Sequence, residues 1–158
     1  MNKINSFVQP DYKNIIDLER KVFVEIKYWF AQIGSLANER QQIIGEMKAI
    51  EQKTCTLREK TLISFQSIES IQEEIERKVL QEHICGKTFI KEQFKLQNQE
   101  YKIICNIEDE IDRLQQENEM NREKLCRIDR EIAHLVKNRN KIYEENKGKF
   151  FINDFIVY

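Results

Sequence analysis

The sequence has 158 residues, of which 34% are charged, and 26 basic residues nearly balance 27 acidic ones to give a net charge of −1. This balance lacks the surplus of Lys and Arg that displaces counterions from phosphates, so no nucleic-acid partner is expected. Only four Gly and one Pro are present, which is too few turn residues for a compact domain of several elements and is typical of long helices.

The first segment, residues 1–13, is predicted to be an extended arm. Gln9 precedes Pro10, and a residue before proline is disfavoured in the helical conformation. The arm also lacks the basic and then apolar pattern of a secretory signal. We therefore expect an intracellular protein with free thiols.

Residues 14–84 are predicted to form a first coiled-coil helix. Apolar residues recur every seven positions, as expected for a helix that faces a partner helix along one seam. The d positions are Ile15, Val22, Trp29, Leu36, Ile43, Ile50, Leu57, Ser64 and Ile71. The a positions are Glu19, Ile26, Ile33, Arg40, Met47, Thr54, Thr61, Ile68 and Ile75.

The heptad pattern is interrupted between about residues 76 and 100. Gly86 lies within this region, and residues 85–88 are predicted to be a hinge or turn. Two arrangements follow, an antiparallel hairpin or one extended, bent helical chain. The extended arrangement is favoured, because a single Gly without Pro or Asn is a weak turn signal.

Residues 89–147 are predicted to form a second coiled-coil helix in a new heptad phase. Its a positions are Ile104, Ile111, Asn118, Leu125, Ile132 and Arg139. Its d positions are Ile107, Leu114, Asn121, Ile128, Leu135 and Ile142. The predicted fold class is therefore all-α, with two long coiled-coil helices.

Residues 148–158 are predicted to be an apolar docking tail, because Gly148 favours a helix end and the segment beyond it is aromatic and β-branched. An exposed apolar strand promotes aggregation, so this tail is expected to be buried, either on its own helices or on a partner protein, and the partner protein is favoured. Direct membrane insertion is not expected, since the segment is short and contains Asp154. The candidate partner-binding residues in the tail are Phe150, Phe151, Phe155 and Tyr158.

The charges beside the first seam disfavour a parallel homodimer. In-register parallel pairing would place Glu46 opposite Glu51 and Lys53 opposite Arg58, and like charges at such positions are mildly destabilising. A foreign coiled-coil partner, and hence a hetero-oligomer, or antiparallel packing is favoured. Trp29 and Phe30 are candidate partner-binding residues, because a two-stranded coil has little room for Trp at d; packing against the second helix of the same chain is the alternative.

The second seam tolerates parallel pairing. Glu117 would face Arg122 and Lys124 would face Asp129, and both pairs are attractive. Asn118 at an a position is a further candidate partner-binding residue, because a buried Asn fixes register at some cost in stability.

No catalytic, cofactor or metal site is predicted. Gly86-Lys87-Thr88 resembles the end of a phosphate-binding loop, but Gln81 stands where the loop needs another Gly. His83 and Cys85 lack the further closely spaced ligands of a zinc site.

Two functions fit this sequence. The first is a non-catalytic structural coiled-coil subunit, a spacer or linker in a cytoskeletal assembly such as a microtubule-associated complex or a ciliary axoneme. Cytoplasmic, cytoskeletal and possible ciliary localisation is expected with it. The second is a tethering or adaptor coiled coil in membrane traffic.

Overall fold

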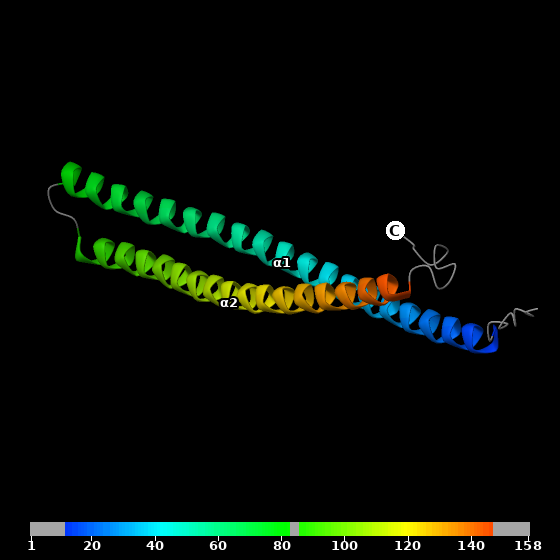
Figure 1. Ribbon diagram of the computed structural model, residues 1–158. Coiled ribbons are helices and arrows are strands. Elements are labelled where there is room, and N and C mark those ends of the chain that lie inside the picture. The colour runs from blue at the N-terminus through cyan, green and yellow to red at the C-terminus, as the bar shows by residue number, and fades with distance from the viewer. Residues whose placement is uncertain (1–11, 83–85, 147–158) are drawn as a thin grey trace, which may run out of the picture. The chain divides into compact units, whose positions relative to one another are not determined.

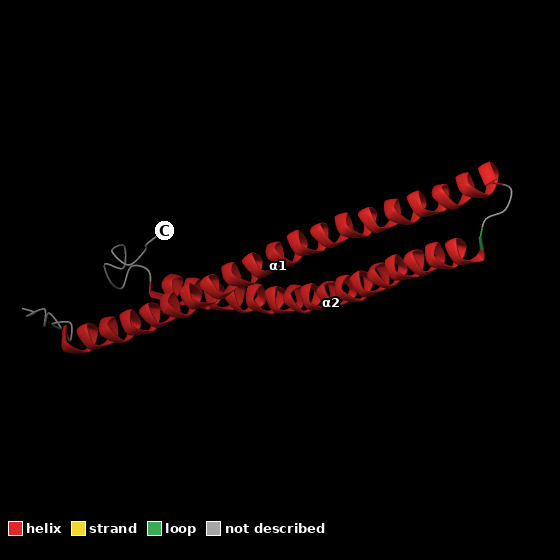
Figure 2. Cartoon of the chain, turned by 180° about the vertical axis from the view of Figure 1, so that it is seen from behind, coloured by secondary structure: helices red, strands yellow, loops and turns green. Residues whose placement is uncertain are grey.

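The computed structural model describes residues 12–82 and 86–146, and these form two long helices. The first, α1, spans Tyr12–Glu82, and the second, α2, spans Lys87–Asn146. Figures 1 and 2 show both helices, and the described residues include no strand. The all-α prediction is confirmed. Residues 1–11 of the predicted arm and the whole docking tail lie outside the described residues, whereas Tyr12 and Lys13 belong to α1.

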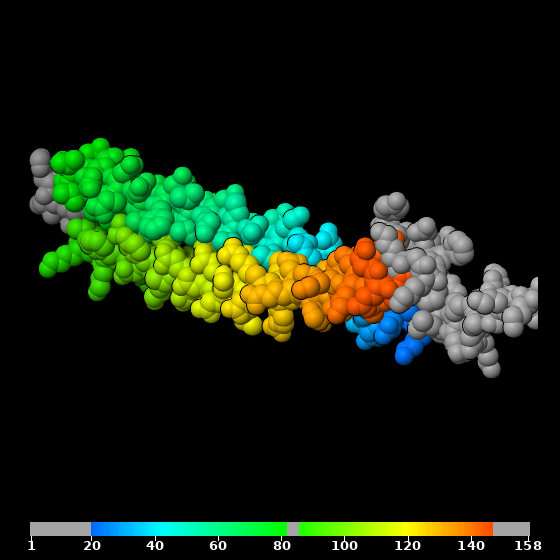
Figure 3. Space-filling view, viewed as in Figure 1, coloured from blue at the N-terminus to red at the C-terminus, as the bar shows by residue number. Residues whose placement is uncertain are grey.

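The chain divides into two compact units, each of which pairs part of α1 with part of α2. Unit 1 comprises residues 1–41 and 125–158, and unit 2 comprises residues 42–124. In Figure 3 the side chains of the two helices meet along unit 2, where green α1 lies beside yellow-green α2.

The two helices pack against each other as an antiparallel hairpin. In unit 2, Lys53 contacts Glu110, and further along α1 Gln72 contacts Gln97. In unit 1, a cation–π contact joins Phe30 to Arg139. Within unit 2 the residue number on α2 falls as that on α1 rises, which defines antiparallel packing. The expected extended arrangement is therefore wrong, because the apolar seam of each helix is covered by the other helix of the same chain.

The core of each unit consists of the seam residues of the two heptad runs. Every predicted a and d position among residues 20–75 and 104–142 is buried or half-buried. The most enclosed apolar side chains are Leu114, Ile104, Ile26 and Ile128, each at most 5% exposed. The remaining buried apolar residues are Val22, Ile43, Ile50, Ile68, Ile75 and Ile107.

The seam of α2 also continues through the region where the sequence pattern was expected to fail. Ile90 and Gln97 lie at a, and Gln93 and Glu100 lie at d, and all four are buried or half-buried. At the predicted interruption the heptad register of α2 is thus unchanged, and the seam residues change from apolar to mostly polar. Polar side chains occupy the seam here, so a count of apolar residues misses it.

Gly86 is the one described residue between the helices. Its carbonyl oxygen accepts a hydrogen bond from the Ile90 backbone N–H at 3.3 Å, which is the first turn of α2. Gly86 therefore lies in the capping position of α2, where Gly is well tolerated. A Cβ atom there would meet no neighbouring atom, so close packing does not require Gly.

Candidate interaction surfaces

Polar side chains interrupt the seam of unit 2. Thr54, Ser64, Gln97, Asn118 and Asn121 are all buried. A buried polar group costs free energy unless it is hydrogen-bonded. Gln97 is hydrogen-bonded to Gln72, whereas the Asn118 Oδ1 atom is buried without a hydrogen-bond partner.

Asn118 borders a shallow hollow of about 230 Å³ between the two helices of unit 2. Ile50, Thr54 and Arg58 line it from α1, and Gln115 and Asn118 are among its α2 residues. Asn118 is 8% exposed and lies in the antiparallel seam with α1 of the same chain, and its role at an interface with another chain stays a prediction. Asn118 is one of five buried polar residues in the seam of unit 2.

The aromatic residues of unit 1 pack partly on their own second helix. Trp29 and Phe30 are half-buried, whereas Tyr28 is 59% exposed. The guanidinium carbon of Arg139 lies 5.3 Å from the centroid of the Phe30 ring, within the range of a cation–π interaction. Intrachain packing therefore accounts for much of the Phe30 surface and leaves its outer part accessible. The other candidate residues, Phe150, Phe151, Phe155 and Tyr158, lie outside the described residues.

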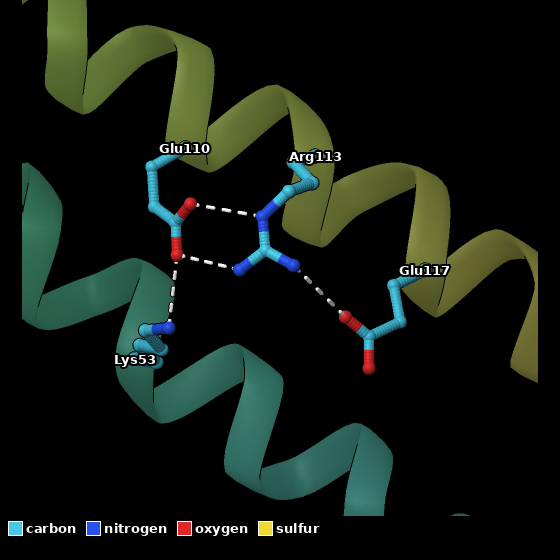
Figure 4. Close-up of polar contacts among 4 residues, drawn as sticks. All are labelled: Lys53, Glu110, Arg113 and Glu117. Atoms are coloured by element: carbon cyan, nitrogen blue, oxygen red, sulfur yellow. Dashed lines mark hydrogen bonds and ion pairs between the residues drawn. The ribbon is translucent and has the colours of Figure 1, made fainter.

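One side of the unit 2 seam has a charged network (Figure 4). The Glu110 carboxylate accepts hydrogen bonds from Lys53 Nζ at 2.9 Å and from the Arg113 guanidinium at 2.7 and 2.9 Å. Arg113 also lies 3.9 Å from a Glu117 oxygen. These bonds, those from Arg113 first, lower the pKa of Glu110 from 4.5 to about 2. Lys53 comes from α1 and the other three from α2, so the Lys53–Glu110 ion pair links the two helices.

The opposite side of the unit 2 seam is apolar near the turn. Phe65 and Val79 of α1 and Phe94 and Tyr101 of α2 are 44–50% exposed. We call these four residues the apolar flank. They surround one contact: the Gln97 Nε2 atom donates a hydrogen bond to Gln72 Oε1 at 3.3 Å.

Heptad spacing places the four residues on the same side of the hairpin. Phe65 and Val79 lie seven residues before and after Gln72, and Phe94 and Tyr101 lie three before and four after Gln97. Residues three, four and seven apart on a helix share a face. Exposed apolar patches of a few hundred Å² commonly mark interaction sites. With about 200 Å² per large side chain, the flank presents roughly 300 Å².

Sequence reasoning missed the apolar flank because it considered only a and d positions, and because it assigned no heptad phase to residues 76–100, which contain Val79 and Phe94. A signal was present: the second heptad phase, continued toward the N-terminus, puts Phe94 and Tyr101 at e positions beside the seam. Apolar residues at e widen the apolar stripe beyond what one partner helix covers.

The rim of the flank is charged with opposite signs on the two helices. From Leu62 to Gln81, α1 has four Glu against Arg77 and Lys78, a net charge of −2. From Lys87 to Ile103, α2 has four Lys against two Glu, a net charge of +2. The four lysines, Lys87, Lys91, Lys95 and Lys102, are all exposed.

Part of this basic rim encloses a shallow hollow on α2. The hollow has a volume of about 460 Å³ and is lined by Lys91, Phe94, Lys95, Asn98, Gln99 and Lys102. An aromatic side chain among three ammonium groups suits a partner surface that combines apolar and acidic side chains.

The described residues offer few features of other functional classes. Cys55, Cys105 and Cys126 are exposed and free. No group of three or more His, Cys, Asp or Glu side chains in residues 12–82 and 86–146 is arranged to hold a metal ion. Neither described helix contains a stretch that is long and apolar enough to cross a membrane.

Comparison with known proteins identifies no relative. No protein-family model, curated protein or solved structure matches the chain.

Proposed function

We propose that this protein is a non-catalytic structural coiled-coil subunit that joins a larger assembly by packing its exposed apolar surfaces against other helices. The observation that supports this proposal is the exposure of the apolar flank of unit 2. Its four large side chains are each nearly half exposed although the helices that bear them are already paired. A further helix laid along this flank would cover them and form a bundle.

We place this assembly in the cytoskeleton, as a spacer or linker of a microtubule-associated or axonemal complex. This part of the proposal rests on the sequence alone: two long heptad segments with closely mixed charges and few turn residues. The half-exposed Trp29 and exposed Tyr28 of unit 1 provide a second surface for such partners.

Detergent extraction of the cells that make the protein tests this proposal. We expect the wild-type chain to remain with the insoluble filament fraction after mild detergent. A Phe65→Glu/Phe94→Glu variant is expected to move to the soluble fraction, because it places two carboxylates on the apolar flank.

Leu80→Glu is the matched control. Leu80 is 76% exposed on α1 but lies outside the flank, so its variant should stay with the filaments. Complete solubility of the wild-type chain in mild detergent would contradict the cytoskeletal assignment and favour a tether in membrane traffic. Retention of the double variant would contradict the role of the flank.

A further inference from the structure

We propose that the apolar flank of unit 2 binds a second copy of this chain, so that two hairpins form a four-helix bundle. This inference deepens the proposed function and rests on it, since it names the first partner of the surface that the proposed function uses. The charges around the flank are of opposite sign on the two helices, which suits a second copy of the same surface.

The charge rim of the flank is complementary to itself in one orientation. The α1 rim includes Glu69, Glu73 and Glu76, which are exposed, and the α2 rim includes Lys91 and Lys95, also exposed. If a twofold axis runs parallel to the helices, α1 of one copy lies against α2 of the other. Acidic and basic rims then meet on both sides of the interface, as expected for an isologous contact.

Positions along the helices match in this orientation. Glu76 lies six residues before the end of α1, and Lys91 lies four residues after the start of α2. In this orientation the connections between the helices lie at the same end in both copies. Residues at a similar distance from the connection are then level with each other, so Glu76 of one copy lies level with Lys91 of the other. A twofold axis perpendicular to the helices would instead place Glu76 near Glu76 of the partner copy, which is repulsive.

The surface shape agrees with the same orientation. The hollow around Phe94 is bordered by three lysines. At the same distance from the connection, the α1 segment of the other copy has the exposed residues Glu69, Glu73 and Glu76, and Val79 of the flank follows them. This segment therefore supplies both acidic and apolar groups to the hollow. Burial of these side chains on both copies removes apolar surface from water, which drives association.

Sedimentation velocity of the purified full-length chain over a range of concentrations tests the inference, with circular dichroism to verify helicity. We expect a reversible dimer. Phe94→Glu is expected to raise the dissociation constant at least tenfold with helicity unchanged, whereas Leu80→Glu should change it less than twofold. If Phe94→Glu lowers helicity, Phe65→Glu provides the same test from α1.

Charge reversal tests the orientation. Glu76→Lys and Lys91→Glu should each weaken the dimer about two- to fivefold, as expected for exposed ion pairs, and the double variant should restore it. Strengthening by Glu76→Lys alone would overturn the proposed orientation.

The inference fails if the wild-type chain is monomeric at every concentration, or if a dimer persists unchanged in both flank variants. The proposed function has a separate readout. If the chain is monomeric but its retention with filaments still depends on the flank, the flank binds a foreign helix. Failure of the dimer inference can therefore be distinguished from failure of the proposed function.

Discussion

The side-chain Nε2 atom of Gln97 on α2 donates a hydrogen bond to Gln72 Oε1 on α1 at 3.3 Å, at the centre of the apolar flank. Gln72 in turn donates to Glu76 Oε1 at 3.0 Å, which links this contact to the acidic rim of α1. At this level a polar side chain of α2 lies in the seam and large apolar side chains lie beside it, whereas α1 contributes the buried Ile68 and Ile75 to the seam. The Gln97 amide is hydrogen-bonded within the chain, and the apolar flank is left for a partner.

Replacing Asn118 by Leu is expected to raise the free energy of unfolding by about 1 kcal/mol or more. Asn118 is 8% exposed and its Oδ1 atom has no partner, so the variant removes an unsatisfied polar atom without losing a hydrogen bond from it. Urea unfolding followed by circular dichroism at one fixed protein concentration measures the change.

Gln97→Leu is the matched comparison, because Gln97 is equally buried at an a position but hydrogen-bonded to Gln72. The loss of that bond offsets part of the gain from the apolar side chain, so a smaller stabilisation is expected. Equal or greater stabilisation by Gln97→Leu would show that the unsatisfied Asn118 oxygen is not costly.

Truncation of Leu114 to Ala is expected to lower the free energy of unfolding by about 2–4 kcal/mol, since it leaves a cavity in the seam. Leu114 is 3% exposed. Met120→Ala is the control, because Met120 lies on the same helix and is 59% exposed. Its effect should stay within about 0.5 kcal/mol in the same urea experiment. Similar effects of the two substitutions would contradict the assignment of the core.

Stability is expected to fall as the pH drops from about 4.5 toward 2. The folded state holds the pKa of Glu110 at about 2, below its ordinary value of 4.5. The Glu110 contribution to stability is therefore fully present above pH 4.5, and it is lost as the pH falls through the folded pKa. Thermal unfolding of the wild type and of Glu110→Gln between pH 6 and pH 2 measures this contribution.

The Glu110→Gln variant should lose less stability over this range than the wild type, because it lacks the titrating carboxylate. Glu123→Gln, an exposed position on the same helix, serves as the control and should keep the wild-type pH dependence. Identical pH profiles for Glu110→Gln and the wild type would mean that the network of Lys53, Glu110 and Arg113 does not form in solution.

Arg139→Gln is expected to destabilise unit 1 by roughly 0.5–1 kcal/mol through loss of its cation–π contact with the Phe30 ring. A double-mutant cycle with Phe30→Leu isolates the coupling between the two side chains. Lys137→Gln is the control, since Lys137 is an exposed basic residue of the same helix. A coupling energy near zero would show that the two helices are not held in this register.

Sequence analysis placed the seams because burial along a helix follows a local seven-residue period. Val22, Ile50, Ile104 and Leu114 illustrate this, since each was assigned to a or d and each is buried. The same reasoning failed at Gln97 and Glu100. Continuing the second heptad phase puts Gln97 at a and Glu100 at d, but both side chains are polar, so a search for apolar residues passed over them.

The sequence by itself determined the all-α fold, the two helices and the face of each helix that is buried, because helical periodicity is a property of neighbouring residues. Only the tertiary structure decided that the two seams cover each other. That choice depends on pairing Lys53 with Glu110 and Gln72 with Gln97, which are 57 and 25 residues apart. Such long-range pairing also decided which apolar residues stay exposed, and it thereby defined the apolar flank.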